Sequence, residues 1–261
     1  MTRPFLYGLA IAATMLSMAA SQSHSSLIGH WKLDDGSGVN VSDSSGNNRD
    51  GVLGSGSWIT AAPPAKVGGA LEFTSSGSGV SVNMGAGVLP SGNSQRTITA
   101  WVSSDVSGDK KFLGYGSGGA GATFDWVVEG SGVWLRHGGG QVKWDFGYTL
   151  GTMMHVAIVV PTGAANVGDV KLYIDGSNTP VTSINNNSTL NTGAATSFHI
   201  GRGFSTAAFD GIVDDVQFYD TQLSDQDITW LAANPGSTIP EPATMSLLAL
   251  GGVALLKRRR A

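Results

Sequence analysis

The residues best suited to bind a cation stand in a polar loop near the start of the chain. Residues 43–50 (DSSGNNRD) combine carboxylates, side-chain amides and hydroxyls with a glycine. Calcium takes about 6–8 oxygen ligands and often mixes carboxylates with backbone carbonyls from flexible loops. Asp43 and Asn48 could supply such oxygens, and Asp214 or Asp215 could supply an opposing carboxylate from the last predicted strand. The same side chains could instead cap turns or face solvent, so both interpretations stay open.

Catalytic side chains are scarce. Outside the C-terminal tail the chain has two glutamates, Glu72 and Glu129, and it has no cysteine. Glycoside hydrolysis with retention needs two carboxyl groups about 5–5.5 Å apart. Asp125 and Glu129 share a face of one predicted strand, but their spacing matches no hydrolase signature, and no H-E-x-x-H or G-x-S-x-G motif occurs. His155, at the start of an apolar strand, is predicted to pack within the fold. The sequence therefore predicts a protein without enzymatic activity.

A sugar-binding surface would need exposed aromatic and polar side chains on one face of a sheet. Trp134 and Arg136 share a face of one predicted strand, and Trp126 and Trp144 lie on its neighbours. We expect Trp126 and Trp144 to lie in the core, where large aromatic side chains contribute most. For Trp134 and Arg136 core packing and ligand binding are equally open, because an arginine on that face favours solvent access. These two residues are the predicted ligand-binding pair.

The elements that position these residues are predicted to be short strands. Glycine supplies 38 of the 261 residues, about twice its ordinary usage of roughly 7%. Glycine turns at 130–132 and 138–140 separate three successive strand patterns, which favours antiparallel pairing. One helix is predicted at 225–233, with Ser224 as its N-cap and Asp227 at N3, close to a capping box. The pattern predicts an all-β sandwich or jelly roll.

The opening strand pattern alternates as a half-buried strand does. Leu27, Gly29 and Trp31 are expected to face one way, and Ile28 with His30 the other way. Trp31 is predicted to lie in the core.

Both ends of the chain have the pattern of targeting segments. Residues 1–21 contain an early Arg3, a mostly apolar run at 5–18 and small residues at 19–21, which is typical of a secretory signal peptide. An uncleaved membrane anchor is the alternative, although the run is short for a span of about 20 residues. We therefore divide the chain into a signal peptide at 1–21, a domain at 22–233, a linker at 234–239 and a tail at 240–261.

The C-terminal tail combines a Pro-Glu-Pro triplet, a mostly apolar run and a basic end, and so resembles the PEP-CTERM sorting signal of exported bacterial proteins. The resemblance implies an exosortase-type membrane protease as a partner, with the tail in the membrane before its removal. The apolar run at 243–256 has 14 residues and would reach about 21 Å as a helix. It is therefore a weak permanent anchor for a hydrocarbon core of roughly 30 Å, although a bare tail anchor is the alternative. The residues of the signal are Pro240, Glu241, Pro242, Arg258, Arg259 and Arg260.

The charge of the domain limits its partners. The whole chain has a formal net charge of −4. Without Arg3 and the four basic tail residues, 10 of 15 basic residues remain, and without Glu241, 18 of 19 acidic residues remain, so the domain carries −8. This charge argues against nucleic acid or anionic lipid. Because cysteine is absent, the exported fold must hold by packing, or by packing plus metal.

Residues 27–233 resemble laminin-G-like domains of the concanavalin A-like superfamily. The resemblance rests on short segments that occur in the same order, the first of which is Trp31-Lys-Leu-Asp-Asp-Gly-Ser-Gly. The resemblance implies a two-sheet antiparallel jelly-roll sandwich, here flanked by an N-terminal signal helix and a short C-terminal hydrophobic helix. It also implies one structural calcium between the first loop and the final strand, which nominates Asp43, Asn48 and Asp214. The matching segments are 31–38, 43–47, 68–73, 97–102, 155–157, 171–176, 209–219 and 223–224.

Together these observations predict an exported, non-catalytic binding or adhesion module that is sorted to the bacterial envelope or the extracellular polysaccharide matrix. Its predicted partner is a polysaccharide or a surface protein. One alternative is a diverged glycoside hydrolase or lyase of the same fold, and another is a purely structural matrix protein. Hydrolases with this jelly roll carry an E-x-D-x-x-E pattern that this chain lacks, which favours the binding module.

Overall fold

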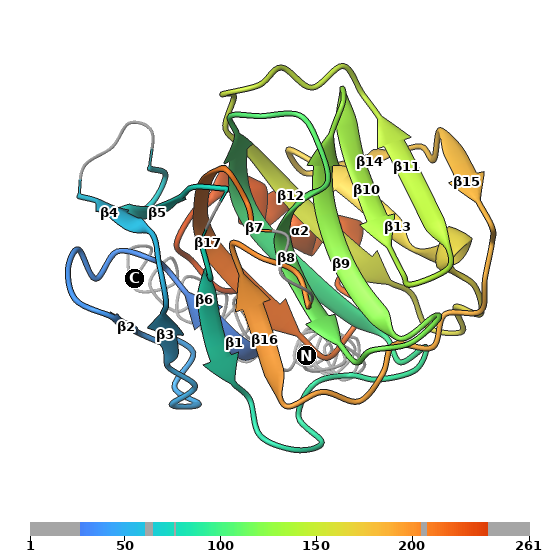
Figure 1. Ribbon diagram of the computed structural model, residues 1–261, viewed down its shortest axis with the longest axis horizontal. Helices are drawn as coiled ribbons and strands as arrows, with labels where there is room; N and C mark the ends of the chain where they lie inside the picture. The colour runs from blue at the N-terminus through green and yellow to red at the C-terminus, as the bar shows by residue number, and fades with distance from the viewer. Residues whose placement is uncertain (1–26, 61–64, 76, 205–207, 240–261) are drawn as a thin grey trace, which may run out of the picture. The chain divides into compact units, whose positions relative to one another are not determined.

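The computed structural model describes residues 27–60, 65–75, 77–204 and 208–239. Over these residues the chain forms an eight-stranded and a nine-stranded antiparallel β-sheet and two short helices (Figure 1). The predicted signal peptide, the predicted C-terminal hydrophobic helix and the residues of the sorting signal lie outside the described residues. No helix within the described ranges is long and apolar enough to cross a membrane.

The eight-stranded sheet is organised around two long strands, β7 (Arg96–Ser104) and β17 (Gly211–Tyr219), which pair with each other and are buried along their whole length. Its other strands are β1 (Leu27–Trp31), β4 (Ser57–Ile59), β5 (Ala70–Phe73), β12 (Met154–Val160), β13 (Lys171–Ile174) and β14 (Ser177–Thr179), and the 3-10 helix η1 (Val167–Asp169) precedes β13. The order is β14-β13-β12-β7-β17-β5-β4, and β1 pairs with β17.

The nine-stranded sheet contains the predicted run of hairpins. Its strands are β2 (Asn40–Val41), β3 (Gly51–Leu53), β6 (Val80–Asn83), β8 (Lys110–Gly116), β9 (Thr123–Glu129), β10 (Gly132–Arg136), β11 (Gln141–Asp145), β15 (Ser183–Asn185) and β16 (Ser197–Ile200). The order is β15-β11-β10-β9-β8-β16-β6-β3-β2. Gly130 and Gly138 adopt φ of 65° and 59° in the turns that flank β10, a region that glycine enters without steric cost. The predicted all-β, two-sheet jelly-roll fold is confirmed.

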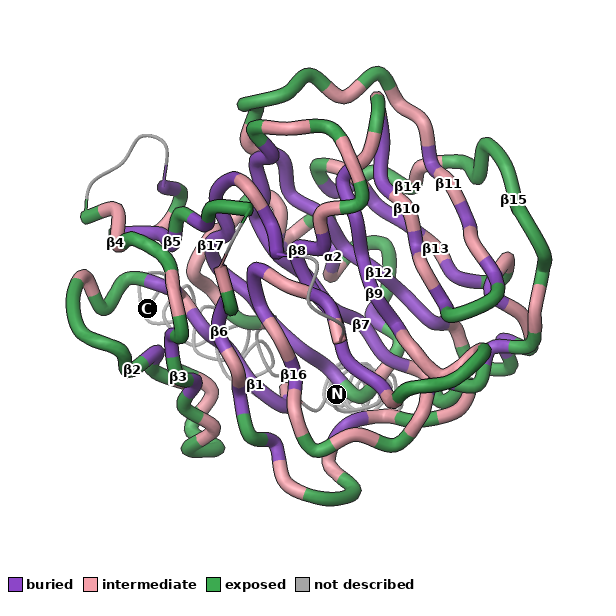
Figure 2. The backbone as a smooth tube through the Cα atoms, viewed as in Figure 1, coloured by how far each residue is buried: buried purple, intermediate pink, exposed green. Residues whose placement is uncertain are grey.

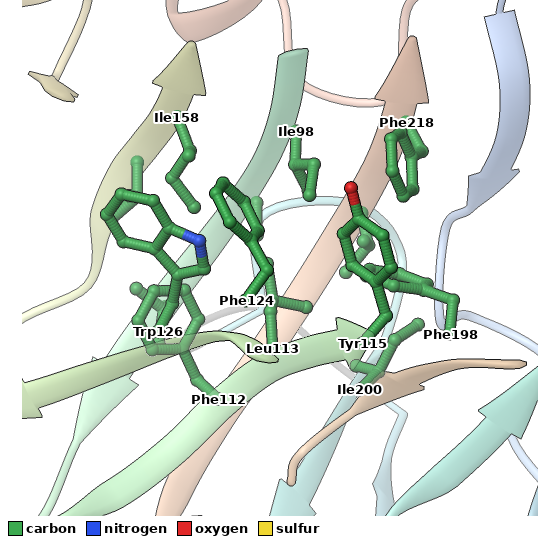
Figure 3. Close-up of a cluster of buried hydrophobic side chains, with 14 of the residues drawn as sticks. Ile98, Phe112, Leu113, Tyr115, Phe124, Trp126, Ile158, Phe198, Ile200 and Phe218 are labelled. Atoms are coloured by element: carbon green, nitrogen blue, oxygen red, sulfur yellow. The ribbon is translucent and has the colours of Figure 1, made fainter. Parts of the chain in front are cut away.

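The hydrophobic core lies between the two sheets. Figure 3 shows Phe124 and Trp126 of the nine-stranded sheet directed toward Ile98 and Ile158 of the eight-stranded sheet. Trp126 and Trp144 are fully buried, and their ring centroids lie 5.6 Å apart. The prediction that these two tryptophans belong to the core is confirmed.

The first strand departs from the predicted alternation. Ile28 and Trp31 both lie in the core cluster, although residues three apart in a regular strand face opposite sides. The pairing with β17 shifts register between Leu27 and Gly29, and such a bulge leaves one residue out of the ladder. The expectation that Ile28 faces away from Trp31 is therefore wrong.

The helix α2 (Asp225–Ala233) begins and ends at the predicted residues. Ser224 Oγ accepts a hydrogen bond from Asp227 N at 3.2 Å, and Ser224 N donates to Asp227 Oδ2 at 3.1 Å, so the predicted capping box is present. The Tyr173 hydroxyl of β13 donates to Asp225 Oδ1 at 2.6 Å. This bond ties α2 to the outer face of the eight-stranded sheet.

The outer faces of the two sheets differ in exposure. Figure 2 shows β7, β12 and β17 buried along their length, whereas β10 and β11 alternate between buried and partly exposed residues. The eight-stranded sheet is therefore covered on both faces at its central strands, and the nine-stranded sheet presents its outer face to solvent at β10 and β11.

Candidate ligand-binding site

A pocket of about 400 Å³ opens on the outer face of the nine-stranded sheet. Lys111 of β8, Asp125 of β9, Arg136 of β10 and Gln141 of β11 line it, together with the glycine turn 138–140. The strand register places Arg136 opposite Asp125 on one side and opposite Gln141 on the other. Side chains alternate between the two faces of a strand. Asp125 and Arg136 follow core residues on neighbouring strands and pair with each other, so both side chains point to the outer face, where the pocket lies.

Asp125 is the most deeply buried carboxylate of the pocket, with 2% of its surface exposed. Its Oδ1 accepts a hydrogen bond from Phe204 N at 2.7 Å, and no described residue donates to its Oδ2. Burial raises the pKa of Asp125 to about 6, although the Phe204 hydrogen bond and the charge of Lys111 lower it in part. A Cβ atom on Gly114, the residue opposite Asp125 in β8, would lie 2.2 Å from Oδ1, so this carboxylate requires a glycine beside it.

Each cation of the pocket and its rim has a carboxylate partner. Arg136 donates to Glu129 Oε2, Lys111 Nζ lies 3.4 Å from Asp109 Oδ2, and Lys143 Nζ lies 2.8 Å from an Asp145 oxygen. The residues that line the pocket include two cations, Lys111 and Arg136, and two carboxylates, Asp109 and Asp125. Their formal charge is therefore zero.

Trp134 is not one of the residues that line the pocket, but it contacts Arg136, which does line it, and it is half-buried. Its Nε1 donates to the carbonyl oxygen of Glu129 at 3.3 Å. The guanidinium carbon of Arg136 lies 4.8 Å from the Trp134 ring centroid, and Lys143 Nζ lies 5.4 Å from it. Cations at such distances are attracted to the indole ring. The structure thus brings the predicted pair, Trp134 and Arg136, into contact on a solvent-facing surface.

The sequence pattern did not identify Asp125 as a ligand-binding residue; it was considered only as a possible catalytic partner of Glu129. Strand geometry of about 3.3 Å per residue places two Cα atoms four residues apart at about 13 Å, well beyond the separation of about 5–5.5 Å in retaining glycosidases. The sequence does contain a local signal for the position of Asp125, because this carboxylate stands between Phe124 and Trp126, which are both core residues. A charged residue there must face the outer side of its sheet.

Asp43, the first predicted calcium ligand, is occupied by hydrogen bonds from its own neighbourhood. Its Oδ1 accepts from His30 N and Ser45 N, both at 2.9 Å, and its Oδ2 accepts from Ser45 Oγ at 2.8 Å and Arg49 N at 3.0 Å. Burial opposes the charged form, but these hydrogen bonds outweigh it and lower the pKa of Asp43. Two bonds to each oxygen use the acceptor capacity of a carboxylate.

The other two predicted ligands differ from Asp43 in their surroundings. Asp214 Oδ2 accepts from Lys66 N at 2.6 Å and from Val67 N at 3.0 Å, while its Oδ1 is buried without a partner. Asn48 adopts a left-handed φ of 56° in the first loop. Within the described part of the chain no group of three or more His, Cys, Asp or Glu side chains could hold a metal ion. Calcium binding by Asp43, Asn48 and Asp214 stays a prediction.

A two-sheet jelly roll with a pocket on one open sheet face is the architecture of a lectin-like domain. The family described as the concanavalin A-like lectin/glucanases superfamily (Laminin_G_3) matches residues 74–229, and the PEP-CTERM protein-sorting motif matches residues 238–260. The chain belongs to the concanavalin A-like lectin/glucanases superfamily and carries a PEP-CTERM motif. The motif indicates an exported protein that is processed by an exosortase. No curated protein sequence matches the chain.

Three solved structures are similar in fold to this chain. Domain 4 of AbnA, an extracellular arabinanase from Geobacillus stearothermophilus in complex with arabinotriose, is 21% identical with a TM-score of 0.59, covering 80% of this chain and all (100%) of that one. The binding domain of Paraclostridial Mosquitocidal Protein 1 is 14% identical (TM-score 0.58; 79% and 51% covered). Trypanosoma rangeli sialidase is 16% identical (TM-score 0.55; 83% and 34% covered). This chain spans about half and one third of the latter two, and these similarities show the fold alone.

Proposed function

We propose that this protein is a non-catalytic module that binds a neutral polysaccharide at the pocket on the nine-stranded sheet. The observation that carries this proposal is a pocket on an open sheet face that Asp125 and Arg136 line, with Trp134 in contact with Arg136 beside it. Binding sites for small polar ligands are concave and combine apolar side chains with a few placed polar groups. The PEP-CTERM motif would deliver this module to the cell envelope or the extracellular polysaccharide matrix.

The chemistry of the pocket favours sugars without charge. Asp125 Oδ2 can accept hydrogen bonds from hydroxyl groups, while the Arg136 guanidinium and the Gln141 amide can donate them. Each cation that lines the pocket already has a carboxylate partner, and the lining residues are formally neutral. A polymer of uronic acids would find no unpaired cation among the described residues of the pocket and would be repelled by the domain's net charge. The bound arabinotriose of the arabinanase domain, a neutral sugar, agrees with this class.

Two carboxylates, Asp109 and Asp125, line the described pocket. We propose binding without turnover because Asp109 is paired with Lys111, which leaves Asp125 as the one lining carboxylate without a cation partner. Asp125 stands in the pocket, and Glu129 of the same strand is engaged by Arg136. Hydrolysis would need one carboxylic acid to protonate the leaving oxygen and a second group as nucleophile or base. A surface protein as ligand is an outcome of the experiment below.

Affinity electrophoresis and calorimetry test the proposal with arabinan, xylan and polygalacturonate as probes. We expect binding to at least one neutral polymer and none to polygalacturonate. Trp134→Ala should weaken that binding at least tenfold, since truncating a tryptophan that anchors a bound partner costs about 2 kcal/mol or more. Trp230→Ala, at a half-buried tryptophan of α2, is the matched control and should bind as the wild type does. Released reducing sugar would establish a hydrolase instead, and absence of binding to every glycan and protein probe would favour a structural matrix role.

A further inference from the structure

The outer face of the eight-stranded sheet holds the part of the chain that leads to the sorting motif. β17 has a register irregularity between Asp214 and Gln217, and Asp215 adopts a left-handed φ of 47° there. His30 Nε2 lies 2.7 Å from Asp215 Oδ1, and Gln217 Nε2 donates to the same oxygen at 3.3 Å. All four residues are buried. We call Asp215 and Gln217, with His30 behind them, the C-terminal clamp.

The clamp binds backbone groups of residues 234–237, which we call the exit segment. Gly236 N donates to Asp215 Oδ2 at 2.7 Å, and Gln217 Nε2 donates to Ser237 O at 3.0 Å. Ser237 N in turn donates to Asn234 O at 3.2 Å. Two backbone groups of this segment, Gly236 N and Ser237 O, are therefore bonded to the folded domain, although the sequence pattern indicated a linker there.

The exit segment also packs against Val67. Gly236 has φ of 77°, and a Cβ atom there would lie 2.9 Å from a methyl group of Val67. Val67 is itself held, because its amide donates to Asp214. The compact unit that contains both sheets ends at Ser237, and the next residue, Thr238, is exposed. The last clamped residue thus directly precedes the PEP-CTERM motif, which matches 238–260.

We propose that the C-terminal clamp sets the upstream limit of tail removal. The hydrolysed peptide bond lies beyond Ser237, and the exit segment stays docked in the mature protein. In this step water adds across one peptide bond: the C–N bond breaks, the carbonyl carbon gains hydroxyl and the leaving nitrogen gains hydrogen. A protease acts on exposed backbone that is free of hydrogen bonds to the fold. Bonds within 234–237 fail this requirement as long as the domain is folded.

Two measurements on the full chain test the proposal. When the protein is produced in a host with an exosortase, the intact mass of the mature form should place its C-terminus beyond Ser237. A mature C-terminus at Ser237 or upstream would overturn the proposal.

The second measurement is limited digestion with proteinase K, followed by mass spectrometry, which needs no exosortase. Wild-type protein should lose its tail with no cut inside 234–237. Gln217→Ala should add cuts there about tenfold faster, as expected from losing hydrogen bonds worth about 1–1.5 kcal/mol. Gln226→Ala, at an exposed glutamine of α2, is the control and should digest as the wild type does. If both variants, folded by circular dichroism, resist equally, the clamp does not protect the exit segment and the proposal fails.

Discussion

The two outer faces of this sandwich both carry acidic side chains on central strands, but they use them differently. On the eight-stranded sheet, Asp214 accepts from two backbone amides and Asp215 from one, and each fastens a covering segment of the chain. On the nine-stranded sheet, Asp125 receives one backbone amide and faces a pocket. An acidic residue on a strand therefore indicates a ligand site only when its face of the sheet is left uncovered.

Coverage follows from the way the chain closes. α2 and the exit segment lie over the eight-stranded sheet. The Tyr173–Asp225 hydrogen bond attaches α2 to the sheet, and the Asp215–Gly236 hydrogen bond attaches the exit segment. β10 and β11 receive no such cover along their outer face. In a fold without disulfides, these polar contacts join segments far apart in the sequence. The covered face then serves stability, and the open face is the one at which we propose that the ligand binds.

The largest expected effect comes from breaking the covered face. Asp214→Ala removes the acceptor of the Lys66 and Val67 amides, and an unsatisfied buried group costs about 1–3 kcal/mol. We expect the free energy of unfolding in urea to fall by about 3 kcal/mol, with polysaccharide affinity unchanged in the folded protein. Asp220→Ala, at an exposed residue just after β17, should change it by less than about 0.5 kcal/mol. A loss below 1 kcal/mol for Asp214→Ala would show that this carboxylate does not hold the covering segment.

The second effect belongs to the open face and concerns binding. The pKa of Asp125 is raised to about 6 by burial, so its carboxylate gains a proton as the pH falls through that value. Loss of the charged acceptor should weaken polysaccharide binding about tenfold between pH 7.5 and pH 5, since charge-assisted hydrogen bonds are roughly twice as strong as neutral ones. Titration calorimetry at both pH values measures this. Asp125→Asn should bind more weakly at pH 7.5 and show a flat profile, whereas an unchanged pH dependence in that variant would remove Asp125 from the site.

The sequence predicted the elements of this fold well because they depend on local patterns. The capping residues of α2 and the alternation of β9 to β11 are visible within a few positions, and the structure has both. The bulges in β1 and β17 were not predictable, since they arise from pairing between distant strands. For the same reason the sequence placed Trp134 and Arg136 on one face without deciding whether it was open. That decision depends on where α2 and the exit segment pack.

The smallest effect concerns the pH dependence of stability, to which one buried group of each face, His155 and Asp125, contributes with opposite sign. Asp214 of the covered face, whose pKa burial raises to about 7, contributes with the same sign as Asp125. Burial lowers the pKa of His155, on the covered face, to about 4. Between about pH 6.5 and pH 4 the unfolded chain binds a proton there that the folded one does not, so acidification lowers the free energy of unfolding. Asp125 behaves oppositely: its folded pKa of about 6 exceeds the ordinary value of about 3.9. The folded state therefore binds the additional proton, and acidification stabilises it.

Replacing each group should separate these opposing contributions. Relative to the wild type, the drop in Tm between pH 7 and pH 5 should shrink in His155→Phe, which keeps a ring beside Trp101, and should grow in Asp125→Asn. About 1 kcal/mol corresponds to roughly 2–4 °C for a domain of this size, so calorimetry resolves both changes. His137 and His199, whose pKa values burial also lowers to about 4, keep the wild-type protein acid-sensitive in each variant. Equal slopes in both variants would mean that the acid response of stability is set by the other buried groups and not by His155 and Asp125.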